Sequence, residues 1–293
     1  MIAAAAAAIG ASAAMFFFSK SKLQEGRPKG SSVTNPTTGP RRYLIGGNWK
    51  SNGTYDENVE RIKVFNEAGP IPDNVDVVLC VPYLHIPMAL SGLRDDIEVG
   101  AQDCGNNTKD GAFTGQIGAH MLSDIGCTWV IIGHSERRVG FGMVGEPEAL
   151  CAEKCKVAVD KGLKVMFAIG EKKEERESGI TMDVCAKQLE PLAKALEPKD
   201  WESIAIAYEP VWAIGTGLTA TPEMAQETHA DIRKWIKENV SEEVSLAVRI
   251  QYGGSMKGAN AVDLLKQPDI DGGLIGSASL KADFFNVING VPK

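Results

Sequence analysis

Residues 203–217 read SIAIAYEPVWAIGTG, and they place an acidic residue directly after a short apolar segment. The segment 203–208 contains neither Gly nor Pro, which is typical of a buried strand. Pro210 has no N–H to donate and fixes its own φ, so the strand must end at Glu209. A carboxylate on backbone stiffened by proline is a candidate acid or base, although an ordinary loop with a solvated glutamate has the same pattern. The glycine-rich tip 214–217 that follows is typical of a mobile lid.

The chain from residue 43 onward repeats this order of an apolar segment followed by an amphipathic one. Helix starts carry caps such as Thr221-Pro222-Glu223. Eight such units without a change of composition predict one α/β domain at 43–293, a closed parallel (β/α)8 barrel. Strands are predicted at 43–47, 75–81, 97–101, 128–133, 164–169, 203–208, 246–252 and 271–275. Helices are predicted at 57–68, 83–93, 117–125, 146–161, 182–196, 222–239, 257–267 and 281–289.

Residues 1–42 differ from the rest of the chain in composition and charge. Residues 2–18 are alanine-rich and apolar, and a stretch rich in Ser, Thr, Pro and Gly without hydrophobic periodicity follows at 26–40. We predict that 1–42 form a targeting leader and a disordered linker, and that the leader is cleaved in a plastid or mitochondrion. An uncleaved leader in contact with a membrane and a cytoplasmic protein are the alternatives.

Charge and cysteine content exclude several classes of function. Residues 1–42 carry +5 and the whole chain −7, so residues 43–293 carry −12. An acidic body argues against nucleic acid as the main partner. Cys151 and Cys155 lie four residues apart on a predicted helix, but no cluster of His or carboxylates completes a metal site. The six cysteines are better explained as buried thiols in a reducing compartment.

Polar residues gather where the predicted strands end, which is the end of such a barrel that carries active sites. Moving a proton between adjacent carbons needs a base at the carbon and hydrogen-bond donors at the oxygens. Glu209 after the sixth strand suits the base. His134 follows the fourth strand and opens a polar turn whose N–H groups could keep the imidazole neutral, as a donor. Lys50 and Asn48 after the first strand supply a positive charge and a neutral donor.

Two glycine-rich turns on consecutive strands predict a phosphate site. Gly253-Gly254-Ser255 follows the seventh strand and Gly276-Ser277 follows the eighth. Barrels often place backbone amides against a phosphate at these two positions, and Gly215 on the lid would add a further amide. Tight turns also use such glycines, so one turn alone would be weak evidence.

The stretch AYEPVWAIGTG at 207–217 resembles the catalytic loop of the triosephosphate isomerase family, and the resemblance extends over residues 43–290. It implies an isomerase that interconverts dihydroxyacetone phosphate and D-glyceraldehyde 3-phosphate through an enediolate, in glycolysis, gluconeogenesis or plastid carbon metabolism. It implies no metal and no organic cofactor. The catalytic positions that match are Asn48, Lys50, His134 and Glu209, and the phosphate-binding ones are Gly215, Ser255, Gly276 and Ser277.

The resemblance also implies an assembly and a structural pair. Residues 111–115, around Thr114, resemble the family's dimer loop and imply a homodimer. Glu136 and Arg137 match a buried ion pair near the site. The chain departs from the family pattern at Ser277, Leu218, Gln116 and Ala168, which replace Gly, Lys, Glu and Cys, and in a three-residue insertion at Met143–Gly145.

Two other functions are compatible with the barrel. A different phosphosugar enzyme, such as a lyase, would need a Schiff-base lysine or metal ligands, and neither is evident. A non-catalytic phosphate-binding or scaffold protein would be expected to have lost Glu209 or His134, and both are present.

Overall fold

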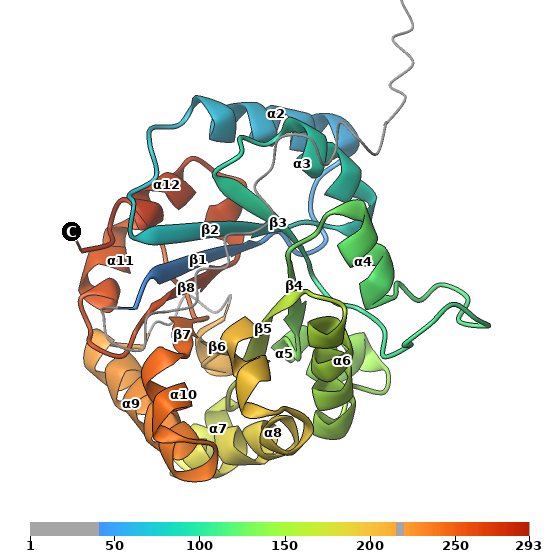
Figure 1. Ribbon diagram of the computed structural model, residues 1–293. Coiled ribbons are helices and arrows are strands. Elements are labelled where there is room, and N and C mark those ends of the chain that lie inside the picture. Colours follow the sequence, from blue (N-terminus) through green and yellow to red (C-terminus); the bar gives the residue numbers. More distant parts are fainter. Residues whose placement is uncertain (1–40, 215–219, 293) are drawn as a thin grey trace, which may run out of the picture.

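The computed structural model describes residues 41–214 and 220–292. Eight strands in this part of the chain form one closed barrel in sequence order, with β1 paired to β8 (Figure 1). All the strand pairings are parallel, which confirms the predicted (β/α)8 barrel. The strands are β1 (Tyr43–Asn48), β2 (Val75–Cys80), β3 (Ile97–Ala101), β4 (Trp129–Ile132), β5 (Lys164–Ile169), β6 (Ile204–Tyr208), β7 (Arg249–Tyr252) and β8 (Gly272–Ile275).

Helices surround the barrel in an outer ring (Figure 1). Within 41–214 and 220–292, no helix has the length and apolar character that crossing a membrane requires. The α-helices are α2 (Tyr55–Glu67), α3 (Ile86–Gly92), α4 (Ala119–Ile125), α5 (Ser135–Val139), α6 (Glu148–Asp160), α7 (Lys173–Glu177), α8 (Thr181–Ala195), α9 (Pro222–Asn239), α10 (Glu242–Ala247), α11 (Gly258–Leu265) and α12 (Asp283–Ile288).

Helix α9 begins where the cap signal in the sequence places it. The Thr221 side chain accepts a hydrogen bond from the Met224 N–H at 3.2 Å, and Pro222 occupies the first turn, where its missing N–H costs nothing. Helix α2 begins with a reciprocal arrangement, in which the Thr54 side chain and the Glu57 side chain each accept from the other's backbone. The polar caps therefore fix these helix starts.

The prediction of a strand from residue 246 was wrong at its beginning. Leu246 and Ala247 end helix α10, and strand β7 begins only at Arg249. Ser241 caps α10 by accepting from the Val244 N–H at 3.1 Å. A short apolar run without periodicity fits a helix end as well as a strand, so the cap was the decisive signal. Helix α7 was also missed because its five residues are all charged.

The core has two layers, one inside the barrel and one between the strands and the outer helices. Trp129 and Met166 fill the barrel interior opposite small residues on neighbouring strands, so large and small side chains interdigitate. Each large side chain that is fully buried contributes about 1.5–3 kcal/mol relative to an exposed one. The inner layer consists of Leu44, Val78, Cys80, Trp129, Ile131, Met166, Ala168, Ala205, Ala207 and Leu274.

Two arginines before β1 belong to the folded barrel, although the sequence boundary was drawn at residue 43. Arg41 pairs through Nε with Asp271 at 2.6 Å, and Arg42 pairs through Nη2 with Asp76 at 2.7 Å. Burial raises the pKa of Asp76, but Arg42 and Arg249 lower it by more, so the net direction is downward. Residues 41 and 42 therefore pack as part of the barrel.

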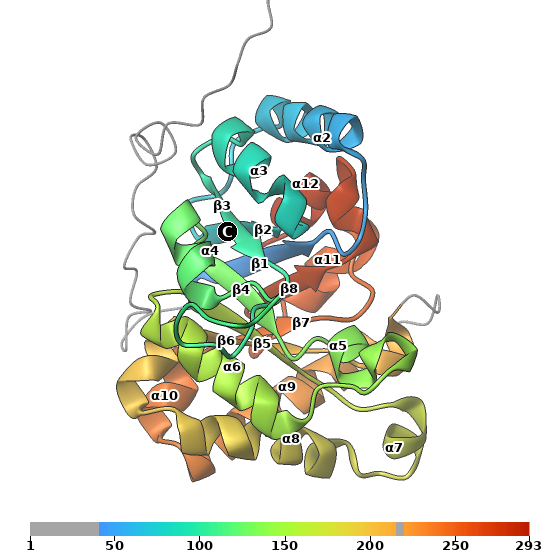
Figure 2. The same ribbon diagram turned by 90° about the vertical axis from the view of Figure 1, so that its right-hand side faces the viewer.

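The two ends of the barrel are distinct. Figure 2 shows α5 and α7 at one end and α10 at the opposite end. Helices α5 and α7 follow β4 and β5, so their end is the C-terminal end of the strands. The segment between β3 and α4 extends away from the barrel wall, and it contains residues 111–115 (Figure 1).

Candidate active site

One cavity at the C-terminal end of the barrel brings together seven of the predicted site residues. Its volume is about 260 Å³. Gly215 and Leu218 lie outside the described residues. The predicted residues that line the cavity are Asn48, Lys50, His134, Glu209, Ser255, Gly276 and Ser277.

Lys50 is held in an unusual backbone conformation. Its φ is +51°, and Phe141 is the single other non-glycine residue with positive φ in the described ranges. Such a conformation costs on the order of 1–3 kcal/mol and persists only where neighbours enforce it. The Lys50 N–H donates to Asn48 Oδ1 at 3.0 Å, and Gln102 Nε2 donates to the Lys50 carbonyl at 2.8 Å. Sequence reasoning missed Gln102, which follows strand β3.

The hydrogen bonds of His134 specify which nitrogen carries the proton. His134 caps α5, and its Nδ1 accepts from the Glu136 N–H at 3.2 Å. Because Nδ1 accepts, the proton of a neutral imidazole must lie on Nε2. Nε2 faces Glu209 Oε1 at 2.9 Å. His134 is therefore presented to the cavity as a donor.

Glu209 is buried, with 2% of its surface exposed, and is fixed by two donors. Its Oε2 accepts from the Ser135 N–H at 2.9 Å, and its Oε1 accepts from His134 Nε2. Burial raises the pKa of Glu209, but His134 and then the Ser135 N–H lower it by more. The carboxylate is therefore ionised at neutral pH, as a base must be.

The contact with Glu209 also changes the pKa of His134. Burial lowers this pKa, while the charge of Glu209 and the hydrogen bond to it together raise it by more. The Glu136 N–H at Nδ1 opposes the rise, because an imidazolium carries a proton on both nitrogens and cannot accept a hydrogen bond. That amide therefore favours the neutral donor form that the sequence predicted.

The backbone around Glu209 is fixed by strands β5 and β7. The Glu209 N–H donates to the Ile169 carbonyl at 2.7 Å, and the Gly253 N–H donates to the Tyr208 carbonyl at 2.7 Å. A Cβ on Gly170 would lie 1.7 Å from the Glu209 carbonyl oxygen, so this position must be glycine. Close packing of the ends of β5, β6 and β7 therefore fixes the backbone position of Glu209.

Ser255 and the pair Gly276-Ser277 line the same cavity as the base. Ser277 begins the 3₁₀-helix η5 (Ser277–Leu280), and it is not among the described residues with positive φ. A Cβ built on Gly276 would lie 3.9 Å from Lys50 Cε, so the lysine side chain passes beside this turn. A cation next to backbone amides is suited to an anionic group.

Comparison with known proteins agrees with this geometry. The profile described as triosephosphate isomerase matches residues 43–291. The cytosolic triosephosphate isomerase of Oryza sativa subsp. japonica is 48% identical over 251 residues, covering 85% of this chain and 96% of the relative. The chloroplastic triosephosphate isomerase of Secale cereale is 49% identical over 254 residues, covering 86% of this chain and 83% of the relative.

The chain belongs to the triosephosphate isomerase family. Among the described residues, the contact between Glu209 and His134 includes none of the departures from the family pattern. Ala168 is fully buried inside the barrel, and the insertion is at the surface, where Val144 is 96% exposed. In the part of the chain that the structure describes, no three His, Cys, Asp or Glu side chains are arranged to hold a metal ion.

Glu136 and Arg137, matched by the triosephosphate isomerase pattern to a buried ion pair, have separate partners. Glu136 accepts from Lys50 Nζ at 2.6 Å, and its side chain is 43% exposed. Arg137 pairs with Asp103 at 2.8 Å and also with Glu146. The two side chains diverge because they are adjacent on α5 and leave the helix in different directions. This corrects the expectation of one buried pair.

A further contact, missed by sequence reasoning, ties the segment that follows Glu209 to the residues after strand β5. Trp212 Nε1 donates to Glu171 Oε1 at 2.9 Å, and the Tyr208 hydroxyl donates to the same oxygen at 3.1 Å. Glu171 is fully buried. The position of Glu171, two residues after the end of β5, is the sequence signal that could have identified it. These bonds fix the 3₁₀-helix η4 (Val211–Ala213), which begins two residues after the base.

Proposed function

We propose that Glu209, His134 and Lys50 carry out the interconversion of dihydroxyacetone phosphate and D-glyceraldehyde 3-phosphate in this chain. Its family makes the chain an aldose–ketose isomerase, and the proposal concerns the residues that act. The observation that supports it is the contact of 2.9 Å between His134 Nε2 and the Glu209 carboxylate inside the cavity. A neutral donor and an ionised base beside each other are the two groups that the reaction needs.

Substrate must replace the contact between the two residues. In the structure the Nε2–H of His134 points to Glu209, so a substrate oxygen can use this donor only after the carboxylate has moved. Glu209 then takes a proton from C1 of dihydroxyacetone phosphate. The hydroxyl proton of O1 passes to O2 through His134 Nε2, which gives a proton to O2 and takes one from O1, and Glu209 returns its proton to C2 of the enediolate. Donation from His134 and the charge of Lys50 stabilise the negative oxygen meanwhile. The Asn48 side chain orients Lys50 by accepting a hydrogen bond from the Lys50 backbone N–H.

A coupled assay with each triose phosphate, with and without EDTA, tests this function against the two alternatives. We expect turnover in both directions that EDTA does not change, because every proposed group is a side chain or a backbone amide. A metal-dependent sugar-phosphate enzyme would lose activity with EDTA. A scaffold protein would turn over neither substrate.

We also propose that the substrate phosphate binds at Ser255, Gly276 and Ser277, with Gly215 contributing from the lid. Support comes from the position of these turns at the ends of β7 and β8, beside Lys50. The phosphate does not react, so its binding should stabilise the substrate and the transition state about equally.

Ser277→Gly should change KM by less than about threefold and leave kcat unmoved. The reason is that Ser277 has no positive φ to relieve, and it keeps the N–H that a glycine would offer. Steady-state kinetics of the two proteins provide the measurement. A tenfold fall in KM, about 1.4 kcal/mol, would show that the serine weakens the phosphate site.

We propose a homodimer that uses the loop around Thr114. This loop belongs to the segment that extends from the barrel wall (Figure 1). The Phe113 side chain in it is 45% exposed. An aromatic side chain on a protruding loop is suited to a pocket of a second copy.

Deleting Gly111–Gly115 should give monomers with low activity, measured by light scattering and the coupled assay. Phe113→Ser is the milder change and should weaken the dimer, because it removes the apolar side chain from the loop. Val262→Ser on α11 is a matched control, since Val262 is 42% exposed on another face. A fully active monomer would show that the dimer is unnecessary, and equal weakening by both serine variants would remove the assignment of this loop.

We propose that residues 1–42 direct the protein to a plastid or mitochondrion. Relatives of the chain include one cytosolic and one chloroplastic protein, so family membership leaves the compartment open. The alanine-rich start and basic linker support an organelle. Residues 1–42 fused to a fluorescent protein in plant cells should give organellar fluorescence, and diffuse cytosolic fluorescence would contradict the proposal.

A further inference from the structure

We propose that Arg138 is a positioning residue for the catalytic pair. Its guanidinium joins the end of strand β4, which carries His134, to the end of strand β5, which holds the backbone of Glu209. The inference rests on the function proposed for those two residues. Arg138 itself does not line the cavity in which they meet.

Two hydrogen bonds make the connection. Arg138 Nε donates to the Gly133 carbonyl at 2.7 Å, and Nη2 donates to the Ala168 carbonyl at 3.0 Å. Gly133 precedes His134 directly. Ala168 precedes Ile169, whose carbonyl accepts the Glu209 N–H at 2.7 Å. One planar group therefore contacts the residue before the donor and the strand that supports the base.

The Arg138 guanidinium connects the β4 and β5 segments just beyond the last pair of residues in their ladder. Pairing between β4 and β5 stops at Ile132 and Phe167. Arg138 connects the next residue of each strand, and its guanidinium carbon lies 5.7 Å from the centre of the Phe167 ring. Arg138 thereby adds hydrogen bonds between the β4 and β5 chain segments beyond their last paired residues, close to the positions from which the two catalytic side chains leave.

The local backbone is shaped to admit this side chain. Gly133 has φ +75°, and a Cβ there would lie 2.7 Å from Arg138 Nη2 and 3.0 Å from the Ala168 carbonyl oxygen. Any larger residue at position 133 would displace the guanidinium. The observed position of Arg138 therefore requires a glycine directly before His134. A lysine cannot replace it, because an ammonium lacks the planar fork that reaches two carbonyls at fixed separation.

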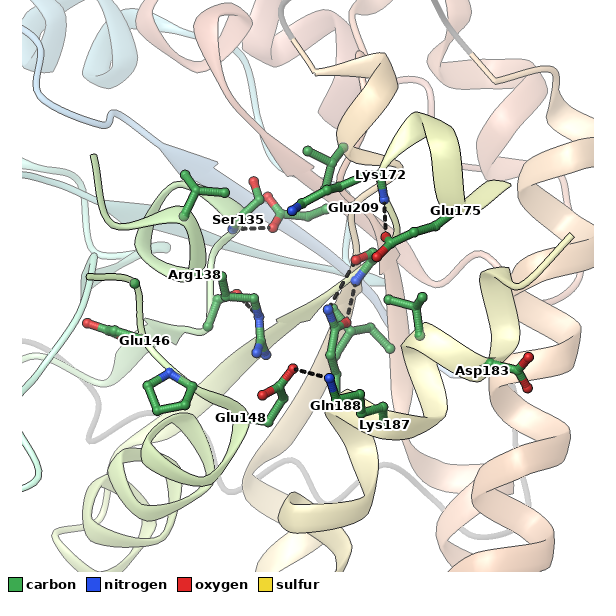
Figure 3. A pocket seen from close by; sticks show the side chains of 18 of the residues that line it. Ser135, Arg138, Glu146, Glu148, Lys172, Glu175, Asp183, Lys187, Gln188 and Glu209 are labelled. Atoms are coloured by element: carbon green, nitrogen blue, oxygen red, sulfur yellow. Dashed lines mark hydrogen bonds and ion pairs between the residues drawn. The ribbon is translucent and has the colours of Figure 1, made fainter. Parts of the chain in front are cut away.

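A second cavity lies beside Gly133 and Arg138. It has a volume of about 640 Å³ and is lined by Arg138, Ser135 and Glu209. Figure 3 shows the guanidinium directed into this cavity, on the side of Glu148 and Gln188. Its Nη1 is buried and has no hydrogen-bond partner in the described chain. Because Arg138 lines this cavity, a small cation can reach the position of the guanidinium through it when the side chain is removed.

Arg138→Lys tests the inference, with Arg233→Lys as its matched control. Arg233 also donates to two backbone carbonyls, those of Ser245 at 2.7 Å and Val248 at 2.9 Å, beside α10 at the opposite end of the barrel. It pairs in addition with Asp269 and Asp271, so its replacement should lower stability at least as much. A purely structural arginine should lower Tm without changing kcat per folded molecule. We expect Arg138→Lys to lower kcat about 10–100-fold with KM changed less than threefold, because small misplacements of catalytic groups have effects of this order.

The imidazole resonances of His134 provide a readout beyond stability. We expect the ¹⁵N shifts of Nδ1 and Nε2 to move in Arg138→Lys and to stay unchanged in Arg233→Lys. If the two variants have the same kcat, KM and imidazole shifts, Arg138 serves stability alone and the inference is overturned. That outcome differs from failure of the proposed function, in which the unmodified protein or Glu209→Gln would give the unexpected kinetics.

Arg138→Ala with added guanidinium covers the case in which the lysine variant does not fold. The cavity can admit the ion, so kcat should rise with guanidinium concentration and saturate, with sodium chloride at equal ionic strength having no effect. Arg233→Ala should show no such rise. An equal response in both alanine variants, or none in either, would overturn the positioning role.

Discussion

Glu209→Gln should lose about 10²–10⁴-fold in kcat, the range found when a general base is removed. The substitution keeps size and shape, and the single amide oxygen can still accept from one of the two donors, either the Ser135 N–H, which bonds Oε2 of Glu209, or His134 Nε2, which bonds Oε1. What it removes is the ability to take a proton. Binding of glycerol 3-phosphate, which has no carbonyl, should stay within a few-fold of the unmodified protein because the phosphate turns are untouched.

Glu209→Asp serves as the control for this loss. It keeps the charge and basicity but withdraws the carboxylate by about one bond length, and a shift of this size can cost about 10²-fold. We expect Asp to retain more activity than Gln in the coupled assay. Turnover of Glu209→Gln near that of the unmodified protein would exclude Glu209 as the base.

Much of the barrel could be predicted because two regularities act together. Each strand is an apolar run bounded by turn residues, and parallel strands in a closed barrel must expose their C-terminal ends on one face. Residues as distant as Asn48, His134, Glu209 and Ser277 therefore had to meet at that face. In the structure these four residues line one cavity.

The rest of the site depends on contacts that have no sequence period. Gln102 and Arg138 act by reaching backbone carbonyls of other strands, and nothing in the spacing of the chain specifies such a target. The same limit applies to Glu136 and Arg137, for which the family resemblance implied one buried ion pair, whereas each has other partners in the structure. Helix α10 was misread because the short apolar run Leu246-Ala247-Val248 fits either element.

Three substitutions at His134 should separate its two roles. The side chain caps α5 through Nδ1 and donates to the cavity through Nε2. Leucine can do neither, and we expect it to lower kcat about 10²–10³-fold, as loss of one transition-state donor does. It should also lower stability by about 0.5–2 kcal/mol through loss of the cap. Asparagine has an oxygen near the Nδ1 position, so it should keep the cap.

Activity should therefore fall in the order Gln, Asn, Leu, while stability should be highest for Asn. A glutamine amide reaches about as far as Nε2 and can still donate to a substrate oxygen, and an asparagine amide is shorter and donates less well. Coupled assays and thermal melts of the three proteins measure the two orders separately. Equal kcat for all three would mean that His134 acts only as the cap of α5, and the electrophile would then have to be Lys50, which lines the same cavity.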